Sequence, residues 1–102
     1  MVIRRNLERR PTLPGELLRE TVLPVLRVSV SKAARELGVT RQTLHRILAE
    51  TQPVTPDMAV RLGKFCGNGP QLWLAMQVDF DLREATNRLK GEIKKIPTRQ
   101  AA

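Results

Sequence analysis

The sequence is poor in the residues that build disulfides and metal centres. It has one cysteine, Cys66, which excludes an internal disulfide, and one histidine, His45. No group of histidine, cysteine and acidic residues has the spacing of a metal site, and no paired-carboxylate or phosphate-loop motif is present. The sequence therefore predicts no metal, no cofactor and no enzymatic activity. We expect Cys66 to be a small buried hydrophobe rather than a nucleophile.

Long apolar runs and aromatic residues are scarce as well. No apolar run approaches the roughly 18 residues that a membrane span needs, and the first residues lack the apolar segment of a secretory signal. These observations predict a cytoplasmic protein. Only 3% of the residues are aromatic and tyrosine is absent, so aliphatic side chains must build the core. Because no segment alternates apolar and polar residues with a period of two, the predicted fold class is all-α.

Positive charge is what the chain has in excess. Lysine and arginine number 18 against 10 acidic residues, which gives a net charge of +8. A surplus of this size on 102 residues favours an acidic partner, for which nucleic acid ranks before a membrane surface.

Helix signals divide the chain into an arm, a domain and a tail. Residues 1–13 are rich in arginine without a sustained period, so we expect a flexible basic arm. Residues 14–89 are expected to form one compact domain, in which Pro24 should stop or kink the first helix, although residues 24–28 could equally extend it. Residues 90–102 are basic and expected to be disordered. The five predicted helices are residues 14–23, 30–37, 41–49, 56–66 and 70–89.

The most informative pattern lies at residues 29–49. Ser29 and Thr40 are typical N-caps of two helices that are separated by a three-residue turn. Glycine permits a positive φ, so the chain can reverse sharply at Gly38, and Ala34 is small where the two helices must cross. This arrangement predicts a helix-turn-helix.

The second helix of the pair has an apolar and a polar face. Its apolar face consists of Leu44, Ile47 and Leu48. Gln42 and Arg46 point away from that face, and their side chains match the hydrogen-bonding edges of adenine and guanine in the major groove. The alternative is a solvated amphipathic helix without a ligand. The cap, the glycine turn, the close crossing and the basic composition together favour DNA recognition.

Four segments resemble the HigA antitoxins (VapI-like proteins), which belong to the λ-repressor-like or XRE helix-turn-helix family. They are Pro14-Gly-Glu-Leu-Leu-Arg-Glu, Ala34-Arg-Glu-Leu-Gly-Val-Thr-Arg-Gln-Thr-Leu, Thr55-Pro-Asp-Met-Ala-Val-Arg-Leu and Pro70-Gln-Leu-Trp-Leu-Ala-Met-Gln. The resemblance covers about residues 14–82. The resemblance implies a compact five-helix λ-repressor-like domain that binds double-stranded DNA at a palindromic operator. It also implies a cognate HigB-like, mRNA-cleaving toxin as a partner.

By this resemblance the turn and the second helix contact DNA. The sequence departs from the family at Val30, where glutamine is common, and in residues 50–54, which lack the usual basic and glycine residues. We therefore expect phosphate anchoring near the start of the preceding helix or from the arginine-rich arm instead. The predicted DNA contacts are Ser29, Ser31, Lys32, Thr40, Arg41, Gln42, Thr43, His45 and Arg46.

The last predicted helix, residues 70–89, carries two apolar faces. One consists of Leu72, Trp73, Met76 and Phe80, and the other of Leu74, Ala75, Val78, Leu82, Ala85 and Leu89. Polar strips that include Gln77 separate them. A helix on a small domain needs one apolar face, so the second predicts a homodimer with Leu74, Val78, Leu82 and Ala85 at its interface. The alternative is that a wide core or the first helix covers the second face.

Three functions fit these observations. The first is an antitoxin that neutralises its toxin and represses its own operon by binding a palindromic operator as a dimer. The second is a free-standing transcription regulator of the same fold with no toxin partner. The third is a nonspecific RNA-binding or protein-interaction module, against which the lack of exposed aromatic residues for base stacking argues.

Overall fold

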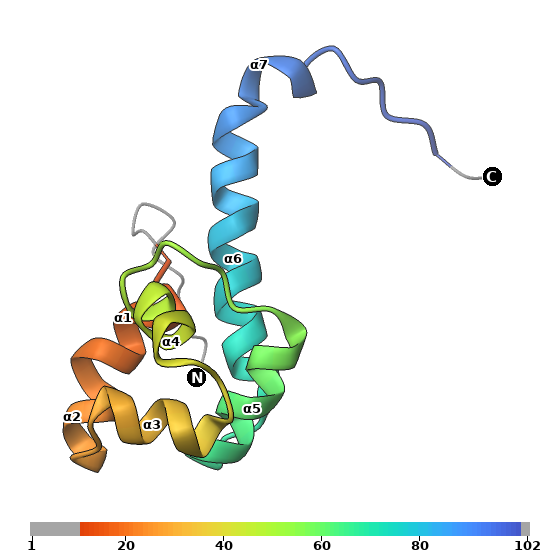
Figure 1. The fold of residues 1–102 in the computed structure, drawn as a ribbon. Helices are drawn as coiled ribbons and strands as arrows, with labels where there is room; N and C mark the ends of the chain where they lie inside the picture. The colour runs from red at the N-terminus through yellow and green to blue at the C-terminus, as the bar shows by residue number, and fades with distance from the viewer. Residues whose placement is uncertain (1–10, 101–102) are drawn as a thin grey trace.

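The computed structural model describes residues 11–100 as helices joined by short loops, with no strand in that range (Figure 1). This confirms the all-α prediction. Three short segments follow one another without a break and form one helical run, residues 14–26. The elements are α1 (Pro14–Leu17), η1 (Leu18–Val22), α2 (Leu23–Leu26), α3 (Val30–Leu37), α4 (Arg41–Leu48), α5 (Pro56–Cys66), α6 (Pro70–Arg88) and α7 (Lys90–Ile93).

In the first helical run, a turn of π-helix precedes Pro24, and the helix continues past the proline. In η1 the backbone N–H of Leu23 donates to Leu18 O, five residues earlier, and α2 then contains Pro24 near its start. A proline inside an α-helix lacks a donor and collides with the carbonyl four residues earlier, and a π-turn changes the local register at that point. Of the two outcomes predicted for residues 24–28, the helix is extended, and it ends at Arg27 with a φ of 54°.

Side chains from every helix between α1 and α6 form one aliphatic core around Trp73. Trp73 and Leu62 are fully buried, and the core also receives Val54 from the loop between α4 and α5. The buried members are Leu18, Leu23, Ala33, Ala34, Leu37, Leu44, Ile47, Leu48, Val54, Met58, Ala59, Leu62 and Trp73. Cys66 is half-buried against this core, and burial raises the pKa of its thiol.

The start of α1 packs directly on the end of α4. A Cβ atom at Gly15 would lie 1.9 Å from Ile47 O, so only glycine allows the two backbones to approach this closely. Leu13, the N-cap of α1, is also buried. The sequence predicts Leu13 to lie in the flexible arm, whereas the structure buries it at the start of the domain.

Counting the run of residues 14–26 as one helix, residues 11–100 contain one helix more than the five predicted. The added element is α7, a single turn at the start of the segment that was expected to be disordered, and its residues are exposed. The C-terminal half of α6 extends beyond the rest of the bundle and leads to α7 (Figure 1). The arginines of the predicted arm, at positions 4, 5, 9 and 10, lie outside the described residues. Within residues 11–100, none of the helices combines the length and hydropathy of a membrane span.

Candidate nucleic-acid interface

The turn between α3 and α4 is closed by backbone hydrogen bonds and by one arginine. Gly38 has a φ of 74°, and Val39 N donates to Ala34 O at 3.0 Å, as expected for a glycine C-cap. Arg61 of α5 reaches across and donates from Nη1 to Leu37 O at 2.8 Å. The predicted glycine turn is therefore present, and Arg61, which the sequence pattern did not single out, holds it against α5.

The N-caps of both helices are those predicted. Ser29 Oγ accepts from Lys32 N at 3.1 Å, and Thr40 Oγ1 accepts from Thr43 N at 3.0 Å. Thr40 also donates its hydroxyl to Thr43 Oγ1 at 2.8 Å. Because this bond uses the hydrogen of Thr40, the hydroxyl hydrogen of Thr43 remains available as a donor at the N-terminus of α4.

The helix α4 presents its polar side chains to solvent. Leu44, Ile47 and Leu48 are buried in the core. The four long polar residues of the helix, Arg41, Gln42, His45 and Arg46, are all exposed, and Thr43 is half-buried. One exposed face thus carries side chains that can donate to and accept from base edges.

The start of α3, the first helix of the pair, adds further polar groups. Ser29, Ser31 and Lys32 are all exposed, whereas Val30 is half-buried against the core. The orphan N–H groups at this helix start and the cation of Lys32 suit phosphate oxygens.

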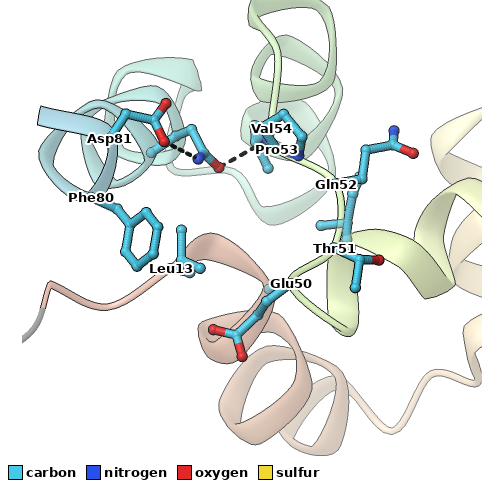
Figure 2. Close-up of a pocket in the computed structure, with 11 residues that line it drawn as sticks. Leu13, Glu50, Thr51, Gln52, Pro53, Val54, Phe80 and Asp81 are labelled. Atoms are coloured by element: carbon cyan, nitrogen blue, oxygen red, sulfur yellow. Dashed lines mark hydrogen bonds between the residues drawn. The ribbon is translucent and has the colours of Figure 1, made fainter. Parts of the chain in front are cut away.

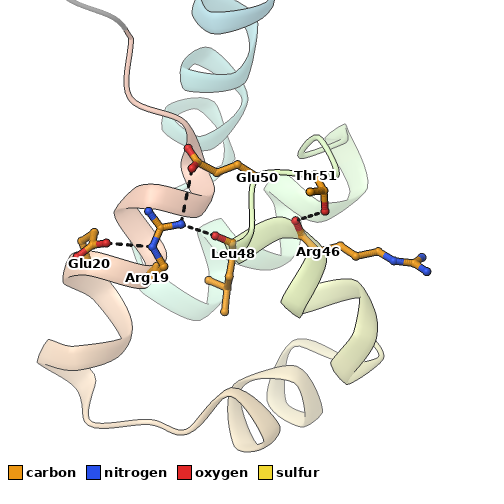
Figure 3. Close-up of polar contacts among 6 residues, drawn as sticks. All are labelled: Arg19, Glu20, Arg46, Leu48, Glu50 and Thr51. Atoms are coloured by element: carbon orange, nitrogen blue, oxygen red, sulfur yellow. Dashed lines mark hydrogen bonds and ion pairs between the residues drawn. The ribbon is translucent and has the colours of Figure 1, made fainter.

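The C-terminus of α4 is fixed by Arg19 of η1 (Figure 3). Arg19 Nη1 donates to Leu48 O and lies 3.7 Å from Glu50 Oε2. The Glu20 carboxylate accepts from Arg19 Nε at 3.0 Å, and this hydrogen bond raises the pKa of the guanidinium. A cation at the last carbonyls of a helix is favourable to the helix dipole. Nothing in the sequence pattern marked Arg19 for this position.

Gln77 of α6 is buried, which corrects its predicted place on a polar strip. Its Oε1 accepts from Val54 N at 2.9 Å, and its Nε2 donates to Asp81 Oδ1 at 3.0 Å (Figure 2). It is the one buried polar side chain among the described residues. A cavity of about 260 Å³ lies beside it, between α6 and the loop that follows α4.

The second apolar face of α6 is accessible in the single chain. Val78 is 44% exposed and Leu82 60% exposed, while Leu74 and Ala85 are half-buried. On the opposite face Trp73 is buried, whereas Leu72 remains exposed. The two predicted faces are thus unequal: the bundle buries Trp73 of the first face and only partly covers Leu74 of the second.

Comparisons with known proteins place the chain among helix-turn-helix antitoxins. No family profile matches the sequence. "Antitoxin HigA-1" of Vibrio cholerae is 31% identical over 90 residues, which are 88% of this chain and 85% of the relative. The structure titled "Pseudomonas aeruginosa antitoxin HigA with higBA promoter" has a TM-score of 0.81 and 30% identity, covering 90% of this chain and 100% of its own. "Antitoxin GraA in complex with its operator" has a TM-score of 0.81 and 37% identity, covering 99% and 100%.

Proposed function

Because this chain belongs to the HigA family of helix-turn-helix antitoxins, we propose that it neutralises a cognate mRNA-cleaving toxin and represses its own operon. In this proposal it binds a palindromic operator as a homodimer. The observation that carries the proposal is the exposed polar face of α4, held in place by a capped turn and two arginines.

DNA recognition is assigned to α4 in the major groove. Gln42 and Arg46 are exposed on its outer face and would pair with base edges, aided by Arg41 and His45 at the sides of the helix. Thr40 and Thr43 lie at its N-terminus, where a hydroxyl donor and free backbone N–H groups suit a phosphate. Backbone contacts from Ser29, Ser31 and Lys32 at the start of α3 would fix the register on the duplex.

Dimerisation is assigned to the exposed face of α6. Val78 and Leu82 are large apolar side chains in contact with solvent, and Leu74 and Ala85 extend the same face along the helix. A two-fold axis would bring this face against its copy and place two α4 helices about 34 Å apart, one turn of DNA. Two such helices read a palindrome.

The proposal of a toxin partner is supported by family membership alone. Members that carry the name antitoxin cover nearly all of this chain, and a HigB-like toxin is the partner that this membership suggests. Co-expression of the protein with the neighbouring small open reading frame, followed by co-purification and a growth assay, tests this part separately.

The DNA-binding part is tested by fluorescence anisotropy. The purified protein is titrated into a labelled duplex from the region upstream of its own gene at about 150 mM salt, with a scrambled duplex as competitor. Specific binding is tighter than nonspecific binding by at least about a thousandfold in typical regulators. Binding that the scrambled duplex displaces equally well would overturn sequence-specific recognition, and binding without toxin neutralisation would leave a free-standing regulator.

A further inference from the structure

One buried hydrogen bond joins α6 to the loop that follows the recognition helix. Gln77 Oε1 accepts from the backbone N–H of Val54 at 2.9 Å. The other end of the same amide donates to Asp81 Oδ1 at 3.0 Å, one helical turn further along α6. Because the amide nitrogen is engaged by Asp81, the amide oxygen is directed at Val54 N. Gln77 is 7% exposed and its bond to Val54 N is buried, so water does not replace that partner easily.

The other end of this loop is fixed to Arg46. Thr51 donates to Arg46 O from its backbone N at 3.0 Å and from its hydroxyl at 3.2 Å. Glu50, between them, has a φ of 62°, which turns the chain out of α4. Only two residues lie between Thr51 and Val54, and Val54 itself is 3% exposed in the core. A short loop fixed at both ends transmits position from one helix to the other.

We propose that Gln77 is a positioning residue that sets the orientation of α4 relative to α6, and thereby the half-site spacing that the dimer accepts. This inference rests on the proposed dimeric function. Val78, the next residue on α6, is exposed on the proposed dimer face, so the same turn of α6 carries both the network and part of that face. An apolar side chain would fill the same volume but could slide, whereas an amide bonded at both ends defines one geometry.

The experiment measures spacing preference. The operator, its variants with one base pair inserted or removed between the half-sites, and a single half-site duplex are titrated with the full-length protein. Each change moves a half-site by about 3.4 Å and rotates it by about 35°. The wild-type protein should lose about tenfold or more in affinity for either altered spacing. Gln77→Met should reduce this discrimination to about threefold or less, with half-site affinity unchanged.

A double variant that exchanges the amide and the carboxylate between positions 77 and 81 tests whether spacing discrimination can be restored. In the double variant Gln77→Glu with Asp81→Asn, the new carboxylate accepts from Val54 N–H and the new amide at position 81 donates to it. Both hydrogen bonds are restored, so wild-type spacing discrimination should return. Gln71→Met, an exposed glutamine on the same helix, is the matched control and should leave discrimination unchanged.

The possible outcomes distinguish failure of the positioning role from failure of the proposed dimeric DNA binding. If Gln77→Met folds and keeps the wild-type spacing preference, the positioning role is wrong. If Gln77→Met does not fold, Asp81→Ala, at an exposed position, removes one end of the network, and unchanged spacing preference in that variant also refutes the role. A wild-type protein that binds as a monomer and ignores spacing refutes the dimeric mode itself.

Discussion

Arg61 Nη1 lies 2.8 Å from Leu37 O and 3.4 Å from Gly38 O, so that a side chain of α5 caps the C-terminus of α3. The two carbonyls are among those that the end of a helix leaves without an intrahelical partner. A guanidinium at this position satisfies them and is favourable to the helix dipole. Arg61 therefore fixes the point at which the chain turns from α3 into α4.

We expect Arg61→Met to lower the free energy of unfolding by about 1 kcal/mol, because a hydrogen bond from a charged donor is lost while the aliphatic stem is kept. Urea denaturation followed by circular dichroism measures this change. The control is Lys64→Met, which removes the same charge from an exposed position of α5. Equal losses for the two variants would mean that charge, rather than the cap, matters.

The close approach of α1 and α4 leads to a second prediction. A Cβ atom at Gly15 would lie 1.9 Å from Ile47 O and 3.4 Å from Leu48 Cα, so Gly15→Ala forces α1 away from α4. We expect a loss of about 1–3 kcal/mol in the free energy of unfolding, the usual cost of overpacking.

The matched control for Gly15→Ala is Gly91→Ala in α7. A Cβ at Gly91 meets no atom within 4 Å, so the stability of the domain should change by less than about 0.5 kcal/mol. The midpoints of thermal unfolding of the two variants measure this difference in stability. Similar midpoints for the two would show that α1 and α4 can separate at little cost.

Local signals explain why much of the helix-turn-helix could be predicted from sequence. Ser29, Thr40 and Thr55 each cap a helix through a hydroxyl and an N–H three residues later, and Gly38 and Gly67 end helices with positive φ. Each of these contacts lies within a few residues in the chain. The bounds of α3, α4 and α5 therefore follow from short segments alone.

Contacts between distant residues could not be predicted in this way. Arg61 and Leu37 are 24 residues apart, Gln77 and Val54 are 23 apart, and Arg19 and Leu48 are 29 apart. On a helical wheel Gln77 belongs to a polar strip, because periodicity does not show that a backbone N–H elsewhere will need its amide. The extra turn of α7 was missed for a different reason, since its four residues have no clear period.

The exposed face of α6 gives a prediction about assembly. Leu82 is 60% exposed in the single chain, so Leu82→Glu should leave folding intact and, in the proposed dimer, place two like charges against an apolar face. We expect sedimentation velocity at micromolar concentration to change from dimer to monomer. Asn87→Glu, exposed on the other side of the helix, should remain dimeric. A dimer that survives Leu82→Glu would require a different interface.

In the proposed function, sequence discrimination depends on the outer face of α4. The double variant Gln42→Ala with Arg46→Ala removes two exposed side chains that make no contact with the core, so the fold should be retained. Each base contact contributes about 1–3 kcal/mol, so operator affinity should fall about a hundredfold or more. Affinity for a scrambled duplex should fall only a few-fold, because one positive charge is lost.

The control for this variant replaces the same two residue types, one glutamine and one arginine, on α6 instead of α4. Gln71→Ala with Arg88→Ala also removes one amide and one guanidinium, both exposed, from the two ends of α6. Its affinity for operator and scrambled duplex should fall by the same small factor, because only the nonspecific electrostatic term changes. If the variant of α4 behaves like this control in competition anisotropy, then α4 is a basic surface rather than a recognition helix.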